Sequence, residues 1–288
     1  MKPFDEILAA IDWSRMAVPQ PDGYDTDAIL ALAGSGASPL RPAPYQRRPP
    51  EGSHAFCGGM VAVRAGPERG LGSASMVPAA LDHPHLDKAA ALLARWPAAH
   101  AQFQRLVEAV HPYCDLAQVR LGQWAFGSSS HSHEADFGCI LVTVDDPLGL
   151  AQALLHEMAH HKLRAMGVSV EVADRLIANP PDQRFDSPIR KDRTRPMTAV
   201  FHAQYSFMHV TALDLYMLKK ADDPLEATKI LMLLARNVIR MEAGYREIDV
   251  HLRTDSIGQT FVEPFMRWSR QVLDDGRAAL DAHGYTLA

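Results

Sequence analysis

The sequence predicts a mainly α protein of the α+β class, with a small antiparallel β-sheet and a metal site between two core helices. First, apolar residues recur at helical spacing through much of the chain. Second, β-branched and aromatic residues gather mainly at 117–126 and 137–144, on either side of a loop of Gly, Ser and His. Third, LLHEMAHHKLRAMGV at 154–168 places histidines and a glutamate inside an apolar, helix-prone run.

The composition allows a large core and has little charge bias. The 288 residues are 47% apolar, and 29 basic against 34 acidic residues give a net charge of −5. We therefore expect neither nucleic acid nor membrane as a partner. Asp5 and Glu6 stand where a secretory signal needs apolar residues, so we expect a cytoplasmic protein. Cys57, Cys114 and Cys139 are widely spaced, which favours reduced thiols.

The N-terminal part is expected to be a helical region with a proline-rich arm. Short helices are predicted over 4–13 and 26–33. The arm, SPLRPAPYQRRPPEG at 38–52, holds too much proline for a helix or an inner strand. From 86 to 110 apolar residues recur at helical spacing, and Pro97 can begin a second helix, so a helical hairpin or a kinked helix is predicted.

A central helix over 147–166 follows the predicted strands. Asp145 or Asp146 can cap it by accepting a hydrogen bond from a free backbone N–H, and Pro147 suits the first position because its missing N–H would have no partner there. Gly167 ends the helical pattern.

After the central helix comes an irregular, proline-rich and cationic crossing at 179–196. Three further helices are predicted over 197–220, 224–243 and 261–282. We divide the chain into an N-terminal helical region, 1–112, and a metal-binding catalytic region, 113–288, and expect the two to pack as one unit.

HEMAH at 156–160 has the HExxH pattern of helical metal sites. Residues four apart lie on one face of a helix, so His156 and His160 can present two imidazoles to one ion. Glu157 lies about 100° round the axis, where it can act as a general base toward a metal-bound water. Apolar flanking residues favour partly buried histidines, which indicates a metal site more than a solvated helix face.

The third ligand has to come from another segment. The longer pattern HExxHxxGxxH is not met, because Leu163 and Met166 stand at its glycine and second histidine positions. His202 and His209 lie roughly on one face of the following helix, seven residues apart. We favour His202, which lies in the first turn, and expect His209 to be a core histidine.

The crossing segment SPIRKDRTRP carries Arg190, Lys191, Arg193 and Arg195 directly before the helix with His202. A run of charges is often no more than a solvated loop. Alternatively it captures an anion, because the arginine fork meets a carboxylate with two parallel hydrogen bonds.

Three motifs in order, LLHEMAHHKL, SPIRKDRTRP and VFHAQYSFMHVTALDLYML, resemble the HExxH-type peptide-modification proteins, over residues 115–220. That family comprises 2-oxoglutarate-dependent iron oxygenases that act as peptide β-hydroxylases on ribosomally made natural products. Ile189 stands where the family has tryptophan.

The resemblance implies Fe(II) held by His156, His160 and His202. It also implies 2-oxoglutarate bound by Arg190 or Arg195, with Glu157 and Arg195 acting in catalysis. Glu157 as a ligand stays open, because two histidines and one carboxylate are the commoner iron set.

The leading hypothesis is therefore an Fe(II)/2-oxoglutarate-dependent dioxygenase that uses O2 to hydroxylate an unactivated β carbon. Its substrate would be a precursor peptide or a carrier-presented amino acid. The alternative is a zinc metallopeptidase with Glu157 as general base. A third hypothesis is a metal-free helical module that binds peptides. The sequence names neither the modified residue nor the oligomeric state.

Overall fold

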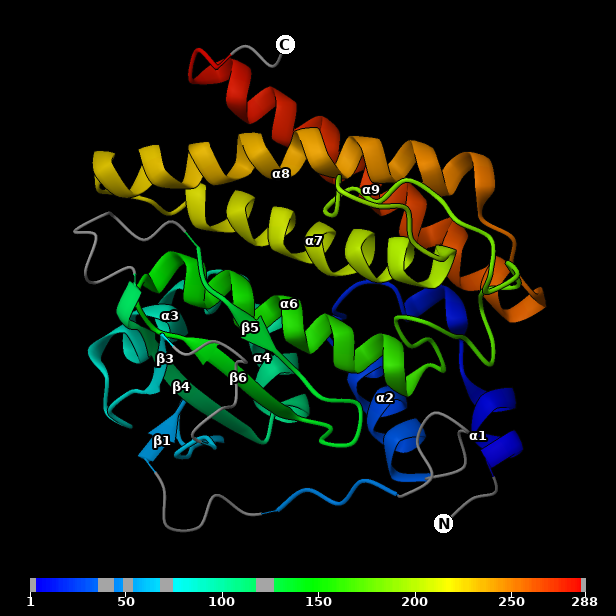
Figure 1. Cartoon of the computed structure of the whole chain (residues 1–288), viewed down its shortest axis with the longest axis horizontal. Helices are drawn as coiled ribbons and strands as arrows, with labels where there is room; N and C mark the ends of the chain where they lie inside the picture. Colours follow the sequence, from blue (N-terminus) through cyan, green and yellow to red (C-terminus); the bar gives the residue numbers. More distant parts are fainter. Residues whose placement is uncertain (1–3, 36–43, 49–53, 68–74, 118–126, 286–288) are drawn as a thin grey trace.

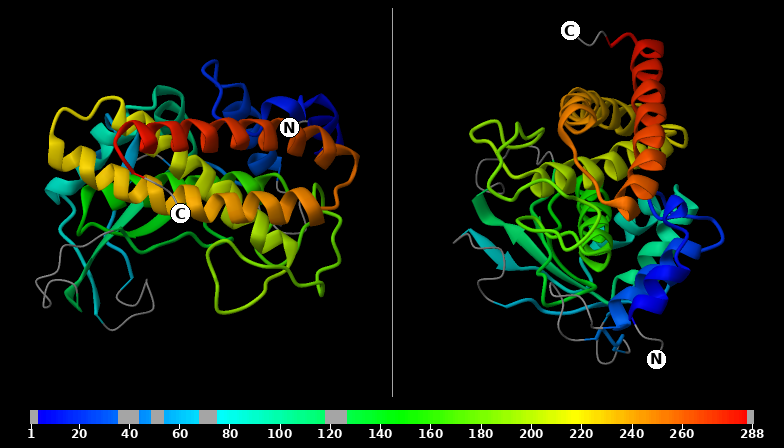
Figure 2. Two further views of the ribbon diagram at one scale, coloured as in Figure 1. Left: turned by 90° about the horizontal axis from the view of Figure 1, so that it is seen from above. Right: turned by 90° about the vertical axis from the view of Figure 1, so that its right-hand side faces the viewer.

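The computed structural model is a mainly helical molecule with one small sheet, and it describes residues 4–35, 44–48, 54–67, 75–117 and 127–285. Helix α6 (Pro147–Ala165) lies between the sheet and helix α7 (Met197–Leu218). Helices α8 (Pro224–His251) and α9 (Ser256–Ala282) pack on the far side of α7 (Figures 1 and 2). The predicted fold of many helices with a small sheet is confirmed.

The sheet is mixed, so the prediction of an antiparallel sheet was wrong in part. Its six strands have the order β1-β2-β4-β6-β5, with β3 also paired to β4. Strand β4 runs parallel to β2 and to β6, and the other pairs are antiparallel. The strands are β1 (His54–Phe56), β2 (Val61–Val63), β3 (Met76–Pro78), β4 (Ala109–Asp115), β5 (Ser130–His131) and β6 (Cys139–Thr143).

The missed strands lack a sequence signal for physical reasons. Three of them have three residues each, too few to show a period of two. Strand β4 contains Pro112, which argues against an inner strand because it has no N–H to donate, yet it pairs with Val142 of β6. Strand β6 confirms the prediction over 137–144. Residues 118–126 of the other predicted strand lie outside the described part.

The N-terminal part of the chain forms short helices, several of which pack against α6. They are α1 (Phe4–Ala10), the 3₁₀ turn η1 (Trp13–Arg15), α2 (Tyr24–Ser35), α3 (Pro84–Leu93) and α4 (Pro97–Leu106). The predicted helical hairpin corresponds to α3 and α4, each of which begins with a proline. Of the proline-rich arm only residues 44–48 are described, and they form neither helix nor strand.

The proposed division at residue 112 stays a prediction. Residues 112 and 113 are consecutive within β4. Side chains from both parts of the chain, such as Ile29 and Leu154, belong to one hydrophobic cluster.

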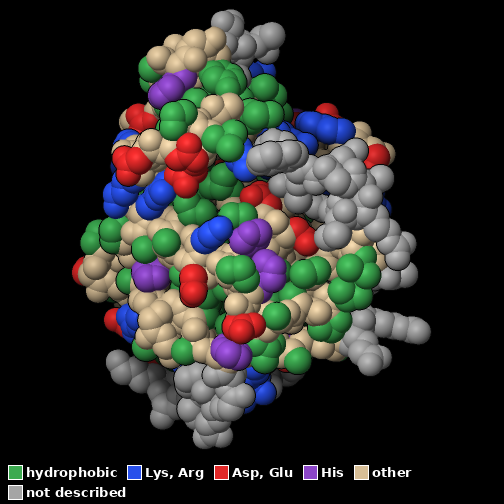
Figure 3. Space-filling view, turned by 90° about the vertical axis from the view of Figure 1, so that its left-hand side faces the viewer, with side chains coloured by type: hydrophobic (Ala, Val, Ile, Leu, Met, Phe, Trp, Pro, Cys, Tyr) green, Lys and Arg blue, Asp and Glu red, His purple; other side chains and the backbone are tan. Residues whose placement is uncertain are grey.

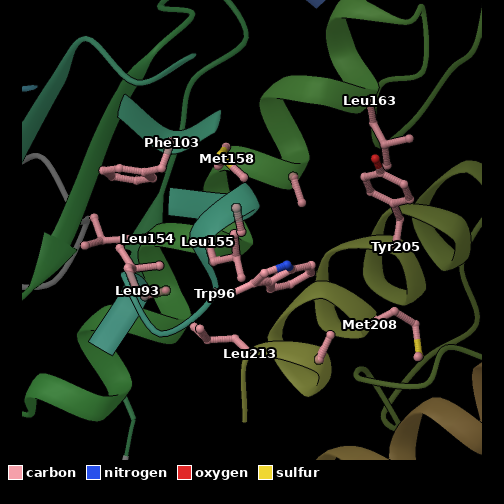
Figure 4. Close-up of a cluster of buried hydrophobic side chains, with 14 of the residues drawn as sticks. Leu93, Trp96, Phe103, Leu154, Leu155, Met158, Leu163, Tyr205, Met208 and Leu213 are labelled. Atoms are coloured by element: carbon pink, nitrogen blue, oxygen red, sulfur yellow. The ribbon is translucent and has the colours of Figure 1, made fainter. Parts of the chain in front are cut away.

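The core lies where α3, α4, α6 and α7 meet. Figure 4 shows Leu155 of α6 next to Trp96, Met158 of α6 on the side of Phe103, and Leu213 of α7 in the same cluster. Leu155, Met158 and Leu213 are fully buried, and complete burial of such side chains contributes about 1.5–3 kcal/mol each. The core thus fixes the helix that carries the histidines.

The surface carries charges of both signs. On the face seen in Figure 3, acidic and basic side chains are interspersed. Among the described residues, no helix combines the length and the apolar content needed to cross a membrane.

Candidate metal site

The ends of α6 are set by local chemistry. The Asp146 carboxylate caps the helix by accepting a hydrogen bond from the N–H of Gly149 at 3.0 Å, and Pro147 occupies the first helical position. Gly167 has φ +92°, and a Cβ there would lie 1.9 Å from Oδ1 of Asp174. The helix therefore starts and stops where the sequence predicts.

His156 and His160 lie one turn apart on α6 and face each other. Their Nε2 atoms are 2.9 Å apart. Two nitrogens bound to one ion at about 2.1 Å lie about 3.0 Å apart at a right angle and about 3.4 Å apart at a tetrahedral angle. The rings thus stand close to the separation that two ligands of one ion need, and the same separation suits a hydrogen bond between them.

His202 of α7 contacts the other side of the His160 ring. The two Nδ1 atoms are 2.8 Å apart, and Nε2 of His202 lies 2.8 Å from the carbonyl oxygen of Val168. A carbonyl only accepts, so Nε2 of His202 donates, and Nδ1 of the neutral ring accepts from Nδ1 of His160. This arrangement leaves the lone pair of His160 on Nε2, directed toward His156.

The structure therefore brings the three predicted histidines together, but in a row. His202 meets Nδ1 of His160, whereas His156 meets Nε2. In this arrangement His202 orients the His160 ring, as hydrogen-bonded partners of metal-binding histidines do. Its role as a third ligand stays a prediction. His209, by contrast, is fully buried beside Tyr205 and Trp268.

Loss of solvent keeps these imidazoles neutral. Desolvation is the main cause that lowers the pKa of His156 and, well below its usual range, that of His160. The same cause lowers the pKa of His202 to about 3. The Arg164 guanidinium acts in the same direction on all three. A neutral ring has the free nitrogen that a metal ion requires.

The Glu157 carboxylate is held in place by two hydroxyl groups. Oε1 accepts a hydrogen bond from Oγ of Ser130 at 2.7 Å, and Oε2 accepts one from Oγ of Ser132. Arg164 in turn donates to Oγ of Ser132 at 2.9 Å. Glu157 is 4% exposed, so strand β5 and the residue after it fix a buried carboxylate beside the histidines.

His156, Glu157 and His160 together can hold a metal ion. One ligand atom from each lies within 4.8 Å of the others. Two imidazoles and one carboxylate suit Fe(II) in oxygenases, and the same donor types also bind zinc. The geometry thus supports the prediction that this segment forms a metal-binding group.

The two predicted arginines are placed differently. Arg190 is about half exposed, and its guanidinium donates to both carboxylate oxygens of Asp192 at 2.9 and 2.8 Å. Arg195 donates to Oε1 of Glu171 at 2.9 Å. Within the described part of the chain, neither guanidinium has a hydrogen bond or an ion pair with the three histidines.

A cavity of about 280 Å³ opens beside His156. Its walls are Ser128–Ser130 before and in β5, Gln152 of α6, Phe207 of α7, and Arg236 and Arg240 of α8. Neither arginine was predicted from the sequence as a site residue. The sequence does contain one signal: Arg236 interrupts the apolar run ILMLLARNVI. Arginine is rarely buried without a partner, so a cation in such a run indicates a candidate binding residue.

No protein-family model matches the chain, and no curated protein matches it either. The resemblance seen in three short motifs therefore stays an expectation.

Proposed function

We propose that the protein is an Fe(II)/2-oxoglutarate-dependent dioxygenase that hydroxylates an unactivated β carbon of a side chain in a ribosomally made peptide. The strongest support is that His156, Glu157 and His160 form a group of two imidazoles and one carboxylate. His156 also lines a cavity whose wall includes two arginines. Such a donor set with open positions is typical of non-haem iron oxygenases. The ordered motifs of the sequence point to the same class.

The side chains of the site would bind the metal ion and orient its ligands. His156 and His160 present neutral nitrogens, and His202 fixes the orientation of the His160 ring through its hydrogen bond. Bound iron would supply the activation of O2, coupled to oxidative decarboxylation of 2-oxoglutarate to succinate and CO2. Phe207 forms part of the cavity wall beside His156, its ring centroid 4.8 Å away, and limits the access of water to that side.

Zinc-dependent peptide hydrolysis is the competing proposal, because Glu157 lies next to the ligand nitrogens, where a general base would act. Against it, each oxygen of Glu157 already accepts a hydrogen bond from a serine hydroxyl. These contacts suit a carboxylate that is held in one orientation better than one that exchanges protons with water.

The test uses the whole chain loaded with Fe(II) under nitrogen. Addition of 2-oxoglutarate should give a visible charge-transfer band, and admission of O2 should then give succinate. The variant His156→Phe should give neither. The control is His283→Phe, which should behave as wild type. His283 is an exposed histidine at the C-cap of α9. Absence of the band and of succinate in wild type would reject the oxygenase.

Hydrolysis would give another result. A chain active only with Zn(II), which releases new peptide N-termini and loses this activity in Glu157→Gln, would establish the peptidase.

A further inference from the structure

Arg236 and Arg240 of α8 line the cavity that also has His156 in its wall. They are four residues apart and therefore lie on the same face of the helix. Both are only partly exposed. Two cations thus line the same cavity as His156 of the metal-binding group.

Neither arginine has a hydrogen bond to a carboxylate in the part of the chain that the structure describes. Within the described residues no ion pair involves Arg236 or Arg240, and Nε of Arg236 is buried with no hydrogen-bond partner. Other arginines near by do pair: Arg246 of α8 and Arg277 of α9 both contact Glu242. Arg236 and Arg240 differ from these paired arginines. They are one helical turn apart, where like charges repel and destabilise the helix.

The acid that acts on Arg236 is Asp214, which is itself buried. Its oxygens accept hydrogen bonds from Gln152 at 2.5 Å and from Asn237 at 2.9 Å. Burial raises the pKa of Asp214 to about 7, so near neutral pH it is only partly ionised. Asp214 thus offsets the charge of Arg236 only in part.

We infer that Arg236 and Arg240 bind a carboxylate of a small 2-oxo dicarboxylic acid, whose oxo acid end lies toward His156. An arginine fork meets a carboxylate with two parallel hydrogen bonds. A bound carboxylate offsets the repulsion between the two arginines and can accept a hydrogen bond from the buried Nε–H of Arg236. The inference rests on the proposed function for the identity of the acid, whereas the contact between arginine and carboxylate needs no metal.

The size and polarity of the cavity favour a small acid. Its volume, about 280 Å³, lies just below the usual range for small-molecule sites, roughly 300–1,000 Å³. A peptide segment would need more room. Gln152 and the serines at Ser128–Ser130 add polar groups to one wall, and Phe207 and Val210 form an apolar wall. This mixture suits a short chain with a polar group at each end.

The assignment replaces Arg190 and Arg195 as the carboxylate site. Arg190 already pairs with Asp192, and Arg195 with Glu171. Either arginine would have to break its ion pair before it could bind the carboxylate of a ligand. They therefore provide matched controls.

The experiment measures the binding of 2-oxoglutarate by calorimetry to the Fe(II)-loaded chain under nitrogen. Arg236→Met and Arg240→Met keep the aliphatic part of the side chain and should each weaken binding about ten-fold or more. Arg190→Met and Arg195→Met should bind as wild type. Wild-type affinity in both cavity variants, or a loss only in the control variants, would overturn the assignment.

A second ligand tests which carboxylate is held. 2-Oxopentanoate lacks the second carboxylate, so wild type should bind it more weakly than 2-oxoglutarate, and the cavity variants should lose little further affinity for it. Equal losses for both ligands would contradict a contact with the second carboxylate. Melting temperatures and the variants Arg236→Lys and Arg240→Lys, which keep the charge, show whether a loss comes from misfolding.

Failure of the inference differs from failure of the proposed function. If iron and 2-oxoglutarate bind but the cavity variants have no effect, only the arginine assignment is rejected. If wild type holds no iron but binds succinate in a manner that depends on Arg236, the carboxylate site stands and the oxygenase does not.

Discussion

Replacement of Lys162 by methionine should destabilise the protein by about 3–5 kcal/mol, because it breaks a buried ion pair. Lys162 Nζ lies 3.1 Å from Oδ2 of Asp25, and both side chains are completely buried. Lys162 follows His160 by two residues, so it projects about 200° away, into the core opposite the metal group. The pair joins α2 to the helix that carries the histidines.

The magnitude follows from what remains after the change. Asp25 also accepts hydrogen bonds from the side chain of Gln102 at 2.5 Å and from the N–H of Gln20 at 3.0 Å. These neutral donors keep the carboxylate hydrogen-bonded but leave its charge without a counter-ion. We therefore place the loss near the lower end, about 3 kcal/mol. The double variant Lys162→Met/Asp25→Asn removes both charges and should lose less than the sum of the single variants.

Urea unfolding followed by tryptophan fluorescence measures these free energies. Lys220→Met, at an exposed position after α7, is the control and should change the free energy of unfolding by about 0.5 kcal/mol or less. If Lys162→Met costs no more than this control, or if the two single losses add in the double variant, the ion pair does not stabilise the core as argued.

Two further predictions concern the surroundings of the site and the effect of pH. Ser132→Ala removes a hydroxyl that holds Glu157 and should lower metal affinity about 10–100-fold in a chelator competition; unchanged affinity would show that the hydroxyl does not matter. Burial lowers the pKa of His209 to about 3, against about 6.5 unfolded, so the unfolded chain binds more protons and stability falls as pH falls from about 6.5 toward 3. His209→Phe should reduce this slope in urea unfolding at several pH values, and an unaltered slope would contradict the assignment.

The central helix was predictable because its signals are local. Asp146, Pro147 and Gly167 act within a few residues of where they stand, and the spacing of His156 and His160 follows from helical geometry alone.

Other boundaries depend on contacts between distant segments. The prediction ended α8 at residue 243, before Gly244, whereas the helix continues to His251. An added Cβ at Gly244 would lie 2.1 Å from Oε1 of Gln204, so the glycine allows α7 and α8 to approach. The close approach at Gly244 cannot be read from the local sequence. Helix α9 begins at Ser256 rather than at residue 261, with Pro264 inside it, and its start does have a local signal that the prediction missed: the Asp255 carboxylate accepts a hydrogen bond from the N–H of Gly258 at 2.6 Å.

The site residues also differ in whether local sequence or contacts between distant segments determine their positions. The pairing of His156 with His160 is a property of one helix, and the approach of His202 follows once α6 and α7 pack together. The position of Arg236 depends on how α8 crosses α7, which no local pattern describes. Arg190 was predicted to bind a carboxylate because of its positive charge, but it forms an ion pair with its own neighbour Asp192.

Metal content is the most direct test of the central claim, that neighbouring nitrogens of His156 and His160 hold one ion. The purified chain is loaded with Fe(II) under nitrogen, freed of excess metal and analysed by mass spectrometry, next to His156→Phe, His160→Phe and the control His283→Phe. We predict that wild type and the control each retain a single ion per chain and that both site variants lose it. Retention of the ion in His156→Phe and His160→Phe, or no ion in wild type, would contradict the account.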